Sequence, residues 1–183
     1  MKEKDLPSPS PDRPLPNSYW VLPGRLLAGE HPSGGDDVPA RLQRLMRAGI
    51  DCYVDLTEEG EQPDYRALLP RHAEYLRSAI ADTSVPFNVS QTRALLISIR
   101  AALARERRVY VHCRAGIGRT GVIVGCFLAE EERNGRKAIA RLNSLWRQSA
   151  RAETWPQVPQ TSEQADYIRH WLKLRDLNPK PGQ

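Results

Sequence analysis

The stretch from Val109 to Glu132, VYVHCRAGIGRTGVIVGCFLAEEE, constrains the fold of this chain more than any other. An apolar, β-branched run ends at His112, a loop of small residues follows, and an apolar helix is predicted from Arg119 to Arg133. A strand that passes through a short glycine-rich loop into a helix is typical of open α/β sheets, which bind ligands at the carboxyl ends of their strands. The stretch therefore predicts a strand–loop–helix unit with a ligand site in its loop.

The rest of the chain repeats this alternation of short strands and longer helices. Short apolar or β-branched runs predict strands at 19–22, 25–28, 51–56, 73–80 and 109–112. Apolar residues three and four apart predict helices at 38–47, 91–105, 119–133, 137–148 and 162–174. Because parallel strands need crossover connections, we expect an α/β fold with a central, mainly parallel sheet and helices on both faces.

The length and composition of the chain predict one folded domain. With 183 residues and 40% hydrophobic content, the chain is long enough for one sizeable core. Residues 1–17 hold five prolines among serines and charges, which predicts a disordered, solvated tail; docking of this segment into an aromatic-lined groove of a partner is the alternative. We therefore expect a single domain at 18–176 and a short C-terminal tail at 177–183.

Charge and cysteine usage narrow the chemistry. The formal net charge is +5 and seven arginines gather between 93 and 119, so we expect an anion site in that stretch. The three cysteines, Cys52, Cys113 and Cys126, match neither a disulfide framework nor a zinc site. Cys52 and Cys126 are expected to be packed thiols. The four histidines lack metal-ligand spacing, so we expect neither a metal nor a cofactor.

The sequence also indicates the setting in which the protein works. No apolar run is long enough for a signal peptide or a membrane span, and unpaired cysteines favour a reducing compartment, so we expect a cytoplasmic protein. Trp146, Trp155 and Trp171 are expected to pack in the core or at an interface rather than stack on nucleic-acid bases. No oligomeric state follows from the sequence.

The loop after His112 has the composition of an anion site with a nucleophile in it. Gly116 and Gly118 let the backbone turn so that successive N–H groups converge, and the following helix adds its positive end. Cys113 lies within this nest, where the aligned N–H dipoles and a nearby cation favour the nucleophilic thiolate. Six residues later, the planar guanidinium of Arg119 can bind two phosphoryl oxygens at once. These residues predict covalent chemistry on a phosphate group.

Residues 112–121, HCRAGIGRTG, resemble the HCxxGxxR(S/T) phosphate loop of the cysteine-based protein tyrosine phosphatase superfamily, and the short chain resembles its small dual-specificity branch. The resemblance implies a phosphate monoester hydrolase that forms a phosphocysteine intermediate. It implies that His112 supports the loop and the thiolate and that Thr120 donates its hydroxyl to the Cys113 sulfur. The implied phosphate-binding residues are Arg114, Ala115, Gly116, Ile117, Gly118 and Arg119.

A general acid must protonate the leaving oxygen, because a thiolate expels an alkoxide or phenolate poorly. Asp82 ends an apolar strand and begins the turn-rich loop DTSVPFN, and its position resembles that of the acid in dual-specificity phosphatases. The expected catalytic set is therefore Cys113, Arg119, Asp82 and Thr120. Asp55 and Glu58 are rival candidates for the acid, in an acidic run that is also typical of a solvated loop.

Further residues are expected to support or surround the site. Gln160 and Gln164 resemble the loop that positions the hydrolytic water in tyrosine-specific members of the superfamily; ordinary polar residues at a helix start are the alternative. The segments 33–39 and 57–65 are expected to wall the pocket.

Three functions remain open from the sequence. The first is hydrolysis of phosphotyrosine in proteins, with phosphoserine and phosphothreonine as further substrates. The second, on the basis of the basic Arg114 in the loop, is hydrolysis of a phosphoinositide, an inositol phosphate or an RNA 5′-phosphate; no other nucleic-acid binding is expected. The third is a catalytically weak module that binds phosphorylated ligands; loss of the cysteine, the arginine or the acid would favour it, and here Cys113, Arg119 and Asp82 are all present.

Overall fold

A computed structural model describes residues 12–35 and 37–177 of the chain, which form a five-stranded sheet. The strands are β1 (Ser18–Leu22), β2 (Leu26–Gly29), β3 (Cys52–Asp55), β4 (Glu74–Arg77) and β5 (Val109–His112). Their order in the sheet is β1-β2-β5-β3-β4. Only β1 runs antiparallel to its neighbour, so the prediction of a mainly parallel sheet is confirmed.

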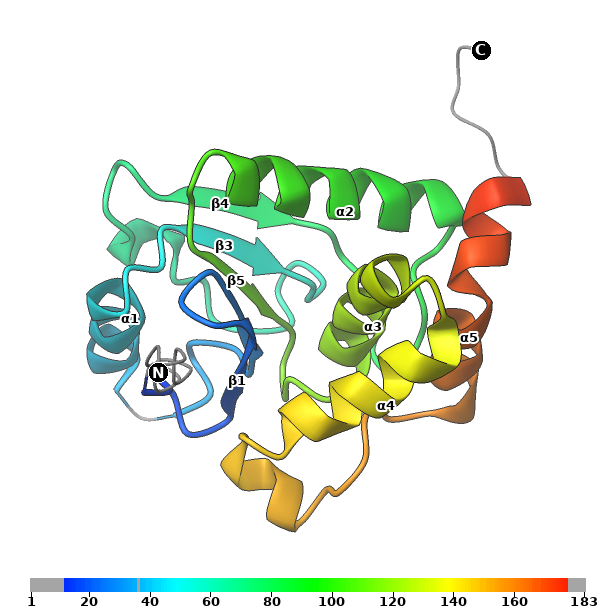
Figure 1. Ribbon diagram of the computed structural model, residues 1–183. Helices are drawn as coiled ribbons and strands as arrows, with labels where there is room; N and C mark the ends of the chain where they lie inside the picture. The colour runs from blue at the N-terminus through cyan, green and yellow to red at the C-terminus, as the bar shows by residue number, and fades with distance from the viewer. Residues whose placement is uncertain (1–11, 36, 178–183) are drawn as a thin grey trace, which may run out of the picture.

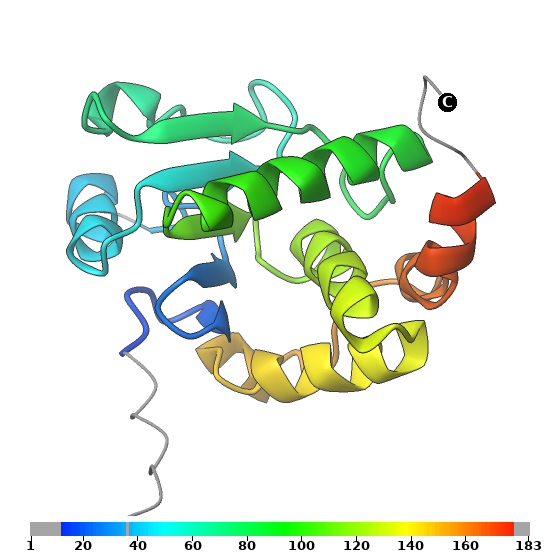
Figure 2. The same cartoon turned by 45° about the horizontal axis from the view of Figure 1, so that its top comes forward.

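Helices cover both faces of the sheet, as the sequence predicts. They are α1 (Val38–Arg47), α2 (Val89–Ala104), α3 (Gly118–Glu132), α4 (Gly135–Trp146) and α5 (Ser162–Leu177), with 3-10 turns η1 (Arg66–Leu68) and η2 (Ala150–Glu153). Figure 1 and Figure 2 show α1 on the left of the sheet and α3, α4 and α5 on the right. The layers are therefore unequal, with one helix against one face and four on the other side.

Alternation along the strands divides the core into two parts. In β5, Val109 and Val111 belong to the cluster that packs under α2 to α5, whereas Tyr110 packs on the α1 side. The helix α3 lies among α2, α4 and α5 and is buried through most of its length, which explains why its sequence is apolar all round. Neither α3 nor any other helix in the described ranges is both long and apolar enough to cross a membrane.

Local sequence signals set most element boundaries. Asp37, Asn88 and Asn134 cap α1, α2 and α4 by accepting hydrogen bonds from backbone N–H groups in the first turn. β5 and α1 have the predicted bounds, but β4 spans only 74–77 instead of 73–80. This edge strand is short because β3 offers it four paired positions.

The packed chain begins earlier than predicted. Of the predicted N-terminal tail, residues 1–11 lie outside the described residues, but Leu15 is fully buried on the α1 side of the sheet. The carbonyl of Pro16 accepts from the Ala150 N–H, and that of Asn17 accepts from the Glu30 N–H. Residues 12–17 thus contact the domain. The predicted C-terminal tail lies outside the described residues beyond Leu177, where α5 ends.

Candidate active site

Cys113 lies at the carboxyl end of β5, the central strand of the sheet. Its side chain is 3% exposed, and five residues later the chain enters α3 at Gly118. The thiol therefore sits between the end of a parallel strand and the N-terminus of a buried helix, as the sequence predicts. The N-terminus of the helix directs positive backbone dipoles toward this position, and the carboxyl end of a strand is where open α/β sheets bind ligands.

The two loop glycines serve different purposes. Gly116 has φ +77°, and a Cβ there would lie 2.5 Å from the carbonyl carbon of Gly29, so only glycine fits. Gly118 does not adopt the left-handed conformation; a Cβ on it would lie 3.0 Å from the side-chain amide of Gln164. The predicted tight turn is thus made at Gly116, while Gly118 allows close packing.

Arg119 is buried, at 1% exposure, and its guanidinium is held from one side. Its Nη1 and Nη2 donate to the two oxygens of Glu61, each at 2.6 Å, and Nη1 also donates to the carbonyl of Ile80 at 3.0 Å. Burial alone would lower the pKa of Arg119, but Glu61 and the Cys113 thiol outweigh it and raise this pKa. Among the described residues, the buried Nε of Arg119 has no hydrogen-bond partner and is a donor left for an anion.

Asp82 bridges two arginines at the site. Its Oδ1 lies 3.1 Å from Nη2 of Arg119, and its Oδ2 lies 3.3 Å from Nη2 of Arg114. The side chains of Asp82 and Arg114 are 43% and 60% exposed, so this bridge lies toward solvent. The structure therefore brings the predicted acid to the predicted cation.

The thiol, the cation and the acid line one small cavity of about 180 Å³. Its lining residues are Asp82, Cys113, Arg114, Ala115, Ile117, Gly118, Arg119, Trp155 and Gln160. We call this space the catalytic cavity. The lining includes a thiol, two guanidinium groups and a carboxyl group. Together these groups suit the hydrolysis of a phosphate ester.

A match to a protein-family model identifies the family of this chain. The model for the dual-specificity and protein tyrosine phosphatase (DSP-PTPase) domain of the Swiss Army Knife protein family matches residues 15–173. The chain belongs to this family. The chain is accordingly a member of the cysteine-based protein tyrosine phosphatase superfamily, in the small dual-specificity-like branch.

Individual relatives agree with this assignment. The chain is 35% identical over 117 residues to protein 067L of Invertebrate iridescent virus 3, named as a candidate tyrosine phosphatase; the match covers 61% of this chain and 45% of that protein. The chain spans about half the length of the two iridescent-virus relatives it matches.

Solved structures share the fold of this chain. Tk-PTP in its active form matches with TM-score 0.69 at 23% identity, over 88% of this chain and 97% of that one. PTPMT1 in complex with PI(5)P matches with TM-score 0.65 at 18% identity, over 87% and 97%. At these identities the matches establish the fold alone.

Neither rival for the general acid reaches the catalytic cavity. Asp55 is fully buried and its carboxylate accepts from the backbone and hydroxyl of Thr57 and from the hydroxyl of Tyr75. Burial acts to raise the pKa of Asp55, but these hydrogen bonds and the neighbouring His112 lower it to about 2. A carboxyl group with such a pKa is a poor acid. Glu58 is exposed and lies outside the cavity lining.

A buried polar cluster supports the phosphatase loop from below. Nε2 of His112 lies 2.6 Å from the hydroxyl of Tyr65, and burial lowers the pKa of His112 to about 3, so its ring is neutral. Nε2 of His31 and Nδ1 of His112 each lie 3.9 Å from a carboxylate oxygen of Asp55. The two histidines thus flank the buried Asp55 carboxylate beneath the loop that carries Cys113.

The same cluster has the composition of a metal site but not its hydrogen-bonding pattern. The ligand atoms of His31, Asp55 and His112 lie within 4.8 Å of one another. However, Nδ1 of His31 accepts from the N–H of Ser33, so the proton of its neutral ring is on Nε2, the atom that faces Asp55. A protonated nitrogen is a donor and not a ligand. With a donor of His31 facing the Asp55 carboxylate, the three residues do not fit a metal-ligand set.

Thr120 does not make the predicted contact. Its hydroxyl is buried and has no hydrogen-bond partner within the described ranges, so it does not donate to the Cys113 sulfur. Sequence adjacency fixes the helical position of Thr120 but not the rotamer that decides where its hydroxyl points.

The two glutamines take different places. Gln160 lines the catalytic cavity, whereas Gln164 is buried. The side-chain oxygen of Gln164 accepts from the backbone of Gln160 at 3.1 Å, and its nitrogen donates to the carbonyl of Ser84 at 2.9 Å. Gln164 thus ties the loop that carries Asp82 to the start of α5.

Two residues that position the site are not predicted from the sequence. Glu61 holds Arg119, and Arg151 donates to the carbonyl of Ala115 at 2.7 Å while its other nitrogen lies 3.4 Å from Glu30. Glu61 falls in the expected wall segment 57–65, but nothing distinguishes it from the neighbouring acids. Neither expected wall segment, 33–39 or 57–65, contributes a described residue to the lining of the cavity; Trp155 and Gln160 do so instead.

Proposed function

We propose that this phosphatase hydrolyses phosphotyrosine in proteins, through a phosphocysteine on Cys113, and that it works in a reducing compartment, the cytoplasm. The observation that carries the proposal is the catalytic cavity, where the Cys113 thiol, the free Nε of Arg119 and Asp82 converge. Two viral relatives are named as candidate tyrosine phosphatases, which supports phosphotyrosine as the substrate class. A reducing compartment is part of the proposal because a thiolate nucleophile must stay unoxidised.

Substrate binding begins with an exchange of anions. The phosphoryl group enters the nest of backbone N–H groups and accepts from Nε of Arg119, while Glu61 keeps its two hydrogen bonds to the same guanidinium. The phosphate competes with Asp82 for Nη2 of Arg119, so the carboxyl group is released toward the leaving oxygen. Binding and the positioning of the acid are thus coupled.

Chemistry then follows in two steps. The Cys113 thiolate attacks phosphorus in line, the bond between phosphorus and the phenolic oxygen breaks, and Asp82 gives its proton to that oxygen. In the second step Asp82 takes a proton from a water molecule, the water oxygen attacks the phosphocysteine, and Cys113 leaves as a thiolate with release of inorganic phosphate. Gln160, in the cavity lining, orients this water. Arg119 stabilises the charge that spreads over the phosphoryl oxygens in both steps.

A phosphoinositide is the second candidate substrate. The guanidinium of Arg114 is 60% exposed beside Asp82, where it offers a cation to a second phosphate of a headgroup. PTPMT1, which shares the fold, has been solved in complex with PI(5)P. Arg114 lies at the exposed rim of the cavity, so this alternative leaves the proposed chemistry unchanged.

The test is a substrate panel with the full chain. We expect phosphate release from phosphotyrosine peptides to exceed that from a soluble phosphoinositide in kcat/KM, to persist in a chelator, and to disappear in Cys113→Ser. A phosphoinositide preference would overturn the protein substrate while sparing the mechanism. The mechanism would be overturned as well if Cys113→Ser hydrolysed substrate, or if the parent chain hydrolysed none of the phosphate monoesters tested.

A further inference from the structure

A second depression adjoins the catalytic cavity. It has a volume of about 380 Å³ and is lined by Thr154, Trp155, Pro156, Gln157, Pro159 and Gln160. We call it the side groove. Trp155 and Gln160 line both spaces, so the two share a wall. A substrate whose phosphate lies in the catalytic cavity therefore reaches the side groove over Trp155.

Trp155 is an exposed indole on a fixed backbone. Its carbonyl accepts from Nε1 of the buried Trp146 at 2.7 Å, and its N–H donates to the carbonyl of Arg151 at 2.8 Å. Its side chain is nevertheless 40% exposed. A large aromatic side chain that is left in solvent on a fixed backbone is typical of a binding surface, because little ordering cost remains when a partner covers it.

The side groove and the catalytic cavity differ in charge. The catalytic cavity is lined by Asp82, Arg114 and Arg119, whereas none of the six residues that line the side groove is charged. A second phosphate or a carboxylate in the side groove would lose water without gaining an ion pair. An apolar side chain would instead bury its surface against indole and proline rings.

We infer that the side groove selects an uncharged, apolar side chain within two residues of the phosphotyrosine, with Trp155 as the specificity-determining residue. The inference rests on the proposed function, since it assigns the rest of the peptide substrate to a surface continuous with the same site. It deepens that function by naming the sequence class of the substrate.

Paired peptides test the inference. Two phosphotyrosine peptides identical except for Leu or Glu at one neighbouring position should differ in kcat/KM by about 10-fold in favour of Leu, at whichever position within two residues of the phosphotyrosine reaches the side groove. Trp155→Ala should bring this ratio close to one. Phe87→Ala is the matched control: Phe87 is another exposed aromatic residue, outside both linings, and its loss should leave the ratio unchanged.

A charge reversal makes the test sharper. Gln157 lines the side groove but not the catalytic cavity, so Gln157→Arg adds a cation only to the former. We expect this variant to favour the Glu peptide, inverting the ratio. Because the ratio compares two substrates of one variant, any general loss of folded protein cancels.

The outcomes separate the two proposals. The proposed role of the side groove would be overturned if Leu and Glu peptides had equal kcat/KM at all tested positions. It would also be overturned if neither Trp155→Ala nor Gln157→Arg changed the ratio. Peptide hydrolysis would still stand in both cases. Hydrolysis of a small aryl phosphate or a phosphoinositide without any hydrolysis of phosphotyrosine peptides would overturn the proposed substrate, and the side groove with it.

Discussion

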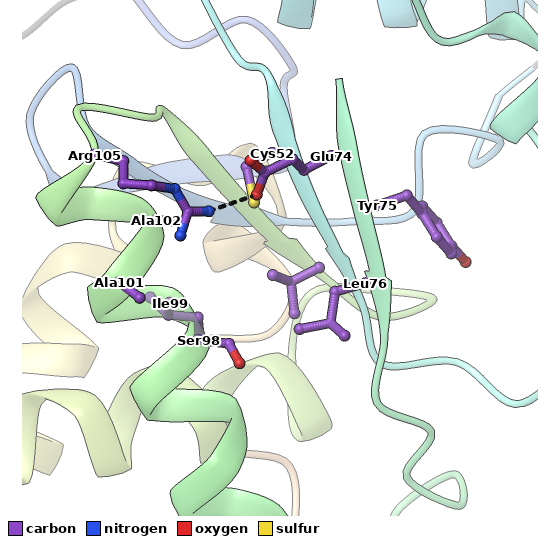
Figure 3. A pocket seen from close by; sticks show the side chains of 10 residues that line it. Cys52, Glu74, Tyr75, Leu76, Ser98, Ile99, Ala101, Ala102 and Arg105 are labelled. Atoms are coloured by element: carbon purple, nitrogen blue, oxygen red, sulfur yellow. Dashed lines mark hydrogen bonds and ion pairs between the residues drawn. The ribbon is translucent and has the colours of Figure 1, made fainter. Parts of the chain in front are cut away.

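Two cysteines at opposite ends of the sheet have opposite surroundings. Cys113 follows β5 at the carboxyl end, in a cavity of about 180 Å³, and Cys52 begins β3 at the amino end, beside a cavity of about 440 Å³. Figure 3 shows the larger cavity between α2 and the strands β3 and β4, with Arg105 paired to Glu74 beside the Cys52 sulfur. The larger cavity is therefore not the one that holds the proposed nucleophile.

The direction of the backbone dipoles explains the difference. Cys113 precedes the N-terminus of α3, whereas Cys52 lies near Ala102 and Arg105 at the C-terminal end of α2, where carbonyl groups point outward. Burial, Glu74 and Asp51 raise the pKa of Cys52 to about 11, and Arg105 does not offset this effect. Cys52 is thus a protonated, unreactive thiol at neutral pH. We propose that helix polarity, rather than cavity size, sets the nucleophile Cys113 apart from Cys52.

The strongest test of this comparison replaces each thiol. Cys113→Ser should lower kcat by at least about 10⁴-fold, because the hydroxyl is a far weaker nucleophile at neutral pH. Cys52→Ser should change kcat less than about 2-fold. Both are measured on an aryl phosphate with circular dichroism as a check on folding. Comparable losses in the two variants would contradict the proposed division of roles.

The cations should differ in the same way. Arg119→Lys keeps the charge but loses the planar fork that binds Glu61 and phosphate together, so we expect kcat/KM to fall about 10³-fold. Arg105→Lys, at the other end of the sheet, should leave kcat/KM unchanged. Steady-state kinetics on the same aryl phosphate decide; an Arg119→Lys enzyme with near-normal kinetics would refute the role of the fork.

Removal of the acid should have a smaller effect that depends on the substrate. Asp82→Asn should lower kcat about 10²-fold for a phenyl phosphate, whose leaving oxygen needs a proton, and much less for an activated aryl phosphate. Asp55→Asn is the matched control for the rival carboxyl group and should show no such dependence on the leaving group. A uniform loss across leaving groups in Asp82→Asn would count against general acid catalysis.

Alkylation compares the thiols directly. At pH 6, iodoacetamide should modify Cys113 at least about 10-fold faster than Cys52, whose pKa is raised to about 11. Inorganic phosphate should protect Cys113 and leave Cys52 unaffected. Peptide mapping by mass spectrometry gives both rates, and preferential modification of Cys52 would reverse the comparison.

The free energy of unfolding should fall at acidic pH because of two buried histidines near the carboxyl end of the sheet. His112 has a pKa of about 3 in the folded state but near 6.5 when unfolded, so the unfolded chain binds the extra proton below pH 6.5 and stability falls as pH decreases. The pKa of His31 is also lowered by burial and acts in the same direction. The free energy of unfolding should drop by up to about 1.4 kcal/mol per pH unit for each such histidine.

Urea denaturation at pH 6.5 and pH 5.0 measures this loss above the range where carboxylates titrate. His112→Asn should show a shallower decrease than the parent chain. A free energy of unfolding that does not change between these two pH values would show that the buried histidines are not neutral.

The sequence predicts those parts of the site that are close together in the chain. Cys113, Gly116 and Arg119 lie in one loop, where spacing and backbone chemistry alone indicate an anion nest. Asp82 required the family resemblance, since nothing local separates an acid that ends a strand from one that caps a turn.

Pairings across the fold were beyond the reach of the sequence. Glu61 is one of several similar acids, and only the folded chain selects it for Arg119. Asp55 and Leu15 are both fully buried, and their burial likewise depends on which segments of the folded chain pack over them. Local patterns determine elements and motifs, whereas the residues that position the motif come from segments distant in sequence.

The contact between Gly116 and Gly29 limits how the sequences of this family can diverge. A Cβ on Gly116 would meet the Gly29 backbone at 2.5 Å, and a Cβ on Gly29 would meet the carbonyl of Asn17 at 2.6 Å. No second substitution can relieve these collisions, because both positions already carry the smallest residue and the obstacles are main-chain atoms. Larger residues are therefore excluded at both positions, each by a different neighbour, and lineages that keep the catalytic loop should keep glycine at 116 and at 29.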